Sequence, residues 1–131
     1  MSKINWIEKL KWNEEHIDDL RYTGYAYIRQ GKYDIALPFF EALAILDPES
    51  VYDIQTLGAI HLQLNQPEKA LALFDRALMF EGDHSATLLN VMKTFTMMGK
   101  VEEAVKLAKI LKNDPNPAIA NVAKALILAY S

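Results

Sequence analysis

The segment from Thr23 to Phe40, TGYAYIRQGKYDIALPFF, decides the fold of this chain. Its apolar residues recur at intervals of three and four, which indicates helix, yet the segment contains two glycines and a proline. Glycine inside a helix costs roughly 1 kcal/mol relative to alanine, and proline costs about 3 kcal/mol. A similar sequence pattern recurs from Leu57 to Phe74, LGAIHLQLNQPEKALALF, with each matching residue 34 positions later. The glycine therefore belongs to a repeated unit.

Three pairs of equivalent residues carry the repeat: Gly24 and Gly58, Ala36 and Ala70, and Phe40 and Phe74. A weaker third copy keeps an apolar pattern at Leu88, Phe95, Gly99 and Ala104, with Met92 replacing the glycine and Ala108 the phenylalanine. Each copy predicts two helices joined by a short turn, with the glycine and the alanine where the helices cross. Burial of the aromatic neighbours Tyr27, Tyr33 and Phe40, at about 1.5–3 kcal/mol each, offsets the lost helix propensity.

Boundary residues agree with this division. Asp47 precedes a proline, which disfavours helix; Ser50 with Asp53 resembles a capping box; and Asn116 caps a helix that starts with proline. Pro38 falls inside a helix and is expected to bend it. We predict an all-α domain over residues 1–131: a short helix over Lys3–Trp12, repeats at about 17–50, 51–84 and 85–116, and a closing helix at 117–131.

The composition fits one folded domain and excludes several classes of function. A chain of 131 residues has the length of a single domain, and 51% apolar residues is ordinary for a globular protein. The net charge of −3 gives no field that attracts nucleic acid, and the lack of cysteine excludes disulfides and cysteine-bound zinc. No apolar run approaches the roughly 20 residues of a membrane span, and no secretory signal opens the chain. We therefore expect a cytoplasmic protein that does not insert into membranes.

Side chains that could perform catalysis or bind a metal do not cluster in the sequence. His16, His61 and His84 lie far apart and fit no metal-binding spacing. The adjacent pairs Asp18–Asp19 and Glu102–Glu103 diverge on a helix, so they cannot converge as an acid and a base. The sequence therefore predicts neither an enzyme nor a bound cofactor.

The pattern from Leu20 to Pro48 places leucine, glycine, tyrosine, alanine and phenylalanine at the positions of a tetratricopeptide repeat (TPR). The chain resembles a TPR protein over about Ile17 to Asn116. Its opening repeat, YIRQGKYDIALPFFEALAILDPES, resembles more narrowly the TPR chaperones of bacterial type III secretion. This resemblance implies a non-enzymatic protein that holds a hydrophobic export client, either a translocator or a needle subunit, in a concave groove. It also implies a small co-chaperone in the needle-subunit branch.

In a TPR array the first helix of each pair lines the concave face. Helical spacing picks out ten residues that point away from the pair interface: Arg21, Tyr25, Ile28, Tyr52, Gln55, Ala59, Leu62, Leu89, Lys93 and Thr96. They form an apolar and aromatic stripe with two cations, which is typical of a surface that binds another protein. The alternative is that some of them, Tyr25 and Leu62 above all, pack against neighbouring helices.

A general TPR adaptor that joins folded proteins is the alternative function. TPR arrays that grip the C-terminal carboxylate of heat-shock proteins use a clamp of lysine, asparagine and arginine on the same helices. Here Arg21 could supply one cation, but Tyr25 and Ala59 stand where asparagines are expected, and only Asn90 is suitable. The sequence therefore disfavours that clamp.

The two ends of the chain leave alternatives open. Trp6 and Trp12 either dock on the first repeat or form a contact with a second copy or a co-chaperone. The closing helix has an apolar face expected to cover the third repeat: Ile119, Val122, Ala123, Leu126, Ile127 and Tyr130. Leu128 lies off that face, so it is either a lone exposed leucine or a contact with another chain.

Overall fold

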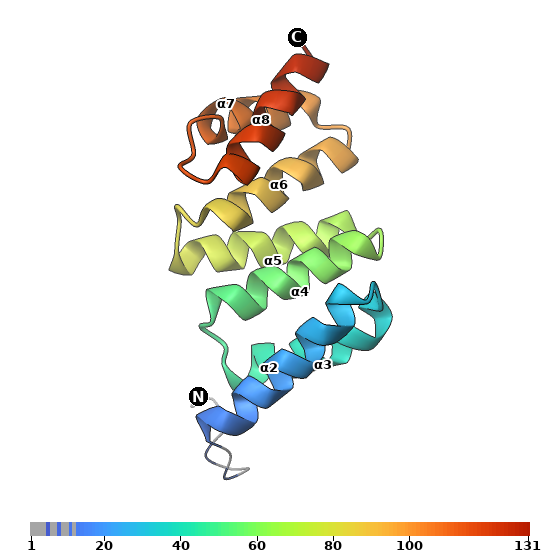
Figure 1. Cartoon of the computed structure of the whole chain (residues 1–131), viewed down its shortest axis with the longest axis vertical. Helices are drawn as coiled ribbons and strands as arrows, with labels where there is room; N and C mark the ends of the chain where they lie inside the picture. Colours follow the sequence, from blue (N-terminus) through green and yellow to red (C-terminus); the bar gives the residue numbers. More distant parts are fainter. Residues whose placement is uncertain (1–4, 6–7, 9–10, 12) are drawn as a thin grey trace.

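The computed structural model describes residues 5, 8, 11 and 13–131, and this part of the chain consists of helices and connecting turns (Figure 1). Seven helices follow one another along it: α2 (Glu14–Arg29), α3 (Tyr33–Leu46), α4 (Val51–Gln63), α5 (Pro67–Phe80), α6 (Ser85–Met97), α7 (Val101–Leu111) and α8 (Pro117–Ala129). Each helix packs on the next. The prediction of a TPR superhelix of three helix pairs and a closing helix is confirmed. Most of the predicted N-terminal helix, including both of its tryptophans, lies outside the described residues.

The turn inside each helix pair has the same backbone conformation in all three repeats. Gly31, Asn65 and Gly99 occupy equivalent positions and have φ angles of 73°, 61° and 77°. This left-handed region is open to glycine and is tolerated by asparagine, so both residue types can reverse the chain here. Gly31, the second glycine of the segment Thr23–Phe40, is thus required by the turn, whereas Gly24 lies within a helix.

Gly24 and Gly58 allow close contact between the two helices of a pair, as predicted. A methyl group added at Gly24 would lie 2.8 Å from Cε2 of Phe40, and one at Gly58 would lie 2.6 Å from Cε1 of Phe74. Both phenylalanines are fully buried. The rings therefore occupy the volume that any side chain at these glycines would need.

In the third repeat the large and the small side chain at the crossing of the two helices have exchanged places. Met92 stands at the glycine position and Ala108 at the phenylalanine position, and both are buried in one cluster with Ala104 and Leu111. A long flexible side chain on the first helix thus replaces a ring on the second helix. Exchanging large and small residues across an interface keeps its packed volume, so the degenerate sequence still forms a helix pair.

Contacts between alternate helices identify the inner side of the stack. Besides its sequential neighbours, α4 packs on α6, and α6 packs on α8. Since helices of a curved stack approach one another on the inside of the curve, these contacts place the first helix of each pair on the concave face. No helix in the described ranges is long and apolar enough to cross a bilayer.

The closing helix α8 covers the third repeat with part of its predicted face. Ile119 and Ala123 are buried with Met92, and two further apolar residues of the face pack partly against that cluster. Val122 and Tyr130 were expected on the same covered face, but this prediction is wrong because both side chains are exposed. Leu128 is exposed as well.

Helix ends follow the capping residues of the sequence. The side chain of Asn116 accepts a hydrogen bond from the backbone N–H of Ala118 at 3.0 Å, and proline fills the first position of α8. Ser50 accepts from the backbone N–H of Asp53 at 3.3 Å. The reciprocal half of the predicted capping box is absent from this site, because the Asp53 carboxylate turns instead towards α2. Pro38 lies inside α3, which continues through it.

Candidate functional site

An aromatic hollow opens on the concave side between α2 and α4. Its volume is about 340 Å³, and nine residues line it: Tyr25, Ile28, Tyr33, Tyr52, Gln55, Thr56, Ala59, Ile60 and Gln63. Five of these belong to the stripe predicted from helical spacing. Tyr25 on α2 and Tyr52 on α4 are each 42% exposed, so their rings are available to a partner. The hollow combines three tyrosines with aliphatic groups, a composition that suits an apolar side chain.

Polar groups border this hollow without filling it. Asn90 on α6 donates a hydrogen bond from Nδ2 to Oε1 of Gln55 at 2.8 Å, which joins the second and third repeats across the concave face. The guanidinium of Arg29 lies 5.1 Å from the centre of the Tyr25 ring, where it makes a cation–π contact. Asn90, the one asparagine suited to a carboxylate clamp, is thus engaged with Gln55.

A second hollow lies further along the same face, between α6 and α8. Its volume is about 380 Å³, and its walls are mostly apolar: Met92, Lys93, Thr96, Val122, Ala125, Leu126 and Ala129. Lys93 and Thr96 were predicted in the groove, but the contribution of α8 was missed. The signal was present in the apolar period of that helix, which we assigned wholly to covering the third repeat.

Leu62 does not line the groove, and the prediction for this residue is wrong. Its side chain is only 7% exposed and belongs to a core cluster with Phe74 and Val91, which holds the second and third repeats together. Leu89, another predicted groove residue, is partly buried and packs against the core of the third repeat. The concave surface is therefore narrower in its middle than the repeat pattern suggests.

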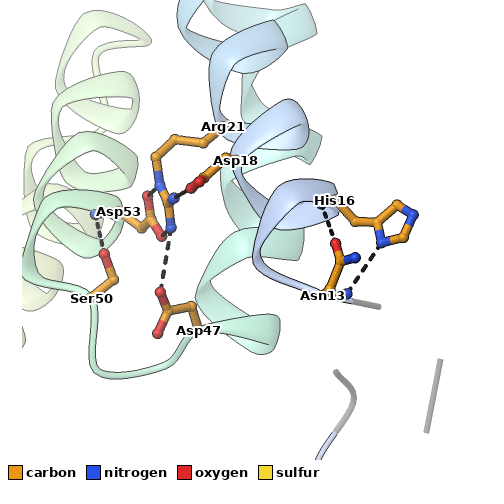
Figure 2. Close-up of polar contacts among 7 residues, drawn as sticks. All are labelled: Asn13, His16, Asp18, Arg21, Asp47, Ser50 and Asp53. Atoms are coloured by element: carbon orange, nitrogen blue, oxygen red, sulfur yellow. Dashed lines mark hydrogen bonds and ion pairs between the residues drawn. The ribbon is translucent and has the colours of Figure 1, made fainter. Parts of the chain in front are cut away.

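Arg21 is the second correction, because its charge is neutralised within the chain (Figure 2). The guanidinium donates through Nε and Nη2 to the two carboxylate oxygens of Asp53, each at 2.7 Å. It also donates to Asp18 at 2.7 Å and to Asp47 at 3.4 Å. Three carboxylates thus surround one cation, so Arg21 is unavailable as a free charge for a partner.

The Arg21–Asp53 pair, in which both side chains meet by two parallel hydrogen bonds, is an ion-pair fork between the first two repeats. Asp53 is fully buried, and its carboxylate bonding raises the pKa of Arg21 above its ordinary value, although burial of the guanidinium opposes this. The pKa of nearby Tyr52 is also raised, first by burial and then by Tyr25. The sequence did not reveal the fork because its members lie 32 residues apart on different helices.

His61 and His84 are each hydrogen-bonded to a nearby side chain. His61 pairs through Nδ1 with Gln66 at 2.7 Å, and His84 pairs through Nδ1 with Thr87 at 2.7 Å. Among residues 5, 8, 11 and 13–131, no group of three histidine, cysteine or acidic side chains could hold a metal ion.

Comparisons with known proteins agree with the geometry. A tetratricopeptide repeat family model matches residues 27–89. No curated protein sequence matches the chain significantly. Among solved structures, a type III secretion complex from Aeromonas hydrophila has a TM-score of 0.83 at 19% identity, over 97% of this chain and 88% of that one.

Two further structures have peptides bound. The Yersinia enterocolitica type III secretion chaperone SycD, in complex with a peptide of the translocator YopD, has a TM-score of 0.79 at 18% identity, over 88% of this chain and 92% of that one. The first TPR of Spaghetti, bound to an HSP90 peptide, has a TM-score of 0.75 at 21% identity, over 87% and 94%. At these identities the likeness concerns the fold: the chain has a TPR fold that matches the translocator chaperones in structure.

Proposed function

We propose that this TPR protein, which has the fold of the type III secretion translocator chaperones, is a non-enzymatic chaperone that holds an apolar segment of an export client on its concave face. The observation that carries the proposal is the pair of hollows on that face. The aromatic hollow and the second hollow lie on helices α2, α4, α6 and α8, which share the inner side of the stack.

The mechanism is masking of apolar surface. A client segment with apolar anchors buries them against Tyr25, Tyr52 and the aliphatic walls of the second hollow. This removes surface that would otherwise aggregate or insert into a membrane. Tyrosine suits such a contact, because its ring provides apolar area at low entropic cost while its hydroxyl group tolerates water. No bond is made or broken, so the client can be released unchanged.

The charge of the chain adds a restriction on the client. The groove contributes two cations at its rim, Arg29 and Lys93, because Arg21 is neutralised by its carboxylates. A client segment that is mainly apolar, with few charges, fits this face best. This favours a hydrophobic secreted protein, such as a translocator or a needle subunit, over the acidic C-terminal peptide that a carboxylate clamp requires.

A general TPR adaptor is the second candidate, and the match to the peptide-bound TPR of Spaghetti favours it. The two functions differ in what happens to the partner. A chaperone keeps an otherwise insoluble client in solution, whereas an adaptor joins proteins that are soluble without it.

Co-expression with candidate translocators and needle subunits tests the proposal. The soluble fraction of the client is measured with the wild-type chain, with Ala59→Arg, which fills the aromatic hollow, and with Met79→Arg. Met79 lies on α5 outside both hollows and is 84% exposed, so it controls for adding an arginine. We expect wild type and Met79→Arg to solubilise a client and Ala59→Arg to fail. Equal client solubility with and without the chain, for every candidate, would refute the chaperone function.

A further inference from the structure

Along the concave face, direct contacts are fewer between α2 and α4 than between α4 and α6 or between α6 and α8. The helix α4 packs directly on α6, and α6 packs on α8. The main packing of α2 is against α3, as that of α4 is against α5 and that of α6 is against α7. Each repeat therefore contacts the next element chiefly through its outer helix, and α2 and α4 have little direct contact with each other. The aromatic hollow lies between these two helices.

The ion-pair fork joins the same two helices. Arg21 projects from α2 one helical turn before Tyr25, and Asp53 directly follows Tyr52 on α4. Its two hydrogen bonds of 2.7 Å fix both the separation and the relative direction of the side chains, because a guanidinium and a carboxylate meet in one plane. The fork therefore connects the two helices beside the tyrosines that form the walls of the hollow.

Stability alone does not account for such a pair. Burying a carboxylate and a guanidinium costs solvation energy that their attraction only partly repays, and apolar side chains of similar volume often serve stability equally well. What a bidentate pair adds is a defined geometry. Here every buried polar side-chain atom of the described residues has a partner, so the fork is fully hydrogen-bonded.

We propose that Arg21 and Asp53 are positioning residues that set the width of the aromatic hollow between α2 and α4. The consequence for a client rests on the proposed function: when the fork is absent, the two tyrosine walls separate and grip an apolar anchor less tightly. Arg21 thus acts on binding through the helices it joins, and not as a charge that contacts the client.

Spin labels measure the width without any client. The chain has no cysteine, so Tyr22→Cys on α2 and Lys69→Cys on α5 provide two unique, exposed labelling sites on the first and second repeats. Pulsed electron resonance then gives the distance distribution between them. The test variant is Arg21→Met with Asp53→Leu, which removes the fork without leaving a buried charge unpaired. The control is Lys106→Met, which removes the exposed 3.9 Å pair with Glu102.

We expect the fork variant to shift the distances to larger values or to broaden them, and the control to leave them unchanged. Arg21→Lys keeps the charge but not the bidentate geometry, so it should show a smaller change in the same direction. This second variant decides the matter if the double variant does not fold. Distributions identical to that of the wild type, in variants with native helix content, would overturn the positioning role.

A binding measurement separates the two proposals. For a client solubilised in the co-expression assay, the fork variant should bind roughly tenfold more weakly, which corresponds to about 1.4 kcal/mol. An unchanged affinity would overturn the link between the fork and binding. If the distances shift but even the wild-type chain solubilises no client, the chaperone proposal fails while the positioning role of the fork stands.

Discussion

Replacing Gly58 with alanine tests the packing on which the helix stack depends. From helix propensity alone, this substitution should stabilise α4 by about 1 kcal/mol. The structure predicts the opposite result. The added methyl group would lie 2.6, 2.9 and 3.1 Å from three ring carbons of Phe74, whereas non-bonded carbon atoms prefer separations of about 3.5–4.0 Å.

The magnitude follows from what can move. Phe74 is fully buried, so its ring cannot swing into solvent, and the contact is relieved only by separating α4 from α5. Overpacking of this kind costs about 1–3 kcal/mol, and three close ring atoms place Gly58→Ala at the upper end. After subtracting the propensity gain, we expect a net loss of about 2 kcal/mol in the free energy of unfolding. At about 4 °C per kcal/mol, the Tm falls by roughly 8 °C.

Urea and thermal denaturation, followed by circular dichroism at the helix band, measure the loss. Gly82→Ala is the matched control, because the nearest atom to its new methyl group is 3.5 Å away, an ordinary contact. Gly58→Met combined with Phe74→Ala copies the third repeat, so it should lose less stability than the sum of its single changes. A Gly58→Ala protein as stable as the wild type, or more stable, would refute the packing argument.

Three smaller predictions concern single side chains. Asn116→Ala removes the cap of α8 and should lower the free energy of unfolding by about 1 kcal/mol in urea denaturation, whereas no change would mean that the cap is dispensable. The pKa of Asp114 is lowered, first by the Ser85 hydroxyl and then by the backbone N–H of Asn116. The contribution of Asp114 to the free energy of unfolding is therefore present above the ordinary pKa of aspartate and is lost as the pH falls through the lowered value. Ser85→Ala should move the pKa of Asp114 upwards in an NMR titration. The pKa of Tyr52 is raised in the folded state. The contribution of Tyr52 to the free energy of unfolding is therefore fully present below the ordinary tyrosine pKa and is lost as the pH rises through the raised value. In an absorbance titration one late-ionising tyrosine should disappear in Tyr52→Phe, and identical curves would contradict this.

The fold was predictable because its signals are local or periodic. Gly24 and Gly58 recur at a fixed interval beside Phe40 and Phe74, and each glycine meets the ring that the repeat implied. Caps such as Asn116 act within a few residues of their own helix. Five of the ten residues of the predicted stripe line the aromatic hollow, because positions that face away from one pair interface tend to face the concave side in every pair.

The errors in the site have a common physical origin. Helical spacing gives the direction of a side chain relative to its own helix, but not the distance to the next repeat. Leu62 is the repeat equivalent of Ile28, which is partly buried, yet Leu62 is buried in one cluster with Val91 of the third repeat. Arg21 and Asp53 find each other only after folding. Contacts between repeats therefore decide which groove residues are accessible to a partner. These contacts do not recur with the repeat period, so the sequence pattern does not reveal them.

Site-specific photo-crosslinking tests the central claim most directly, because it reports which face of the chain touches the client. A benzophenone amino acid replaces Tyr52 in the aromatic hollow or Met79 on α5, and each protein is irradiated with a co-expressed client. We predict a crosslink to the client chain from position 52 and none from position 79. A crosslink from position 79 with none from position 52 would contradict a client held on the concave face.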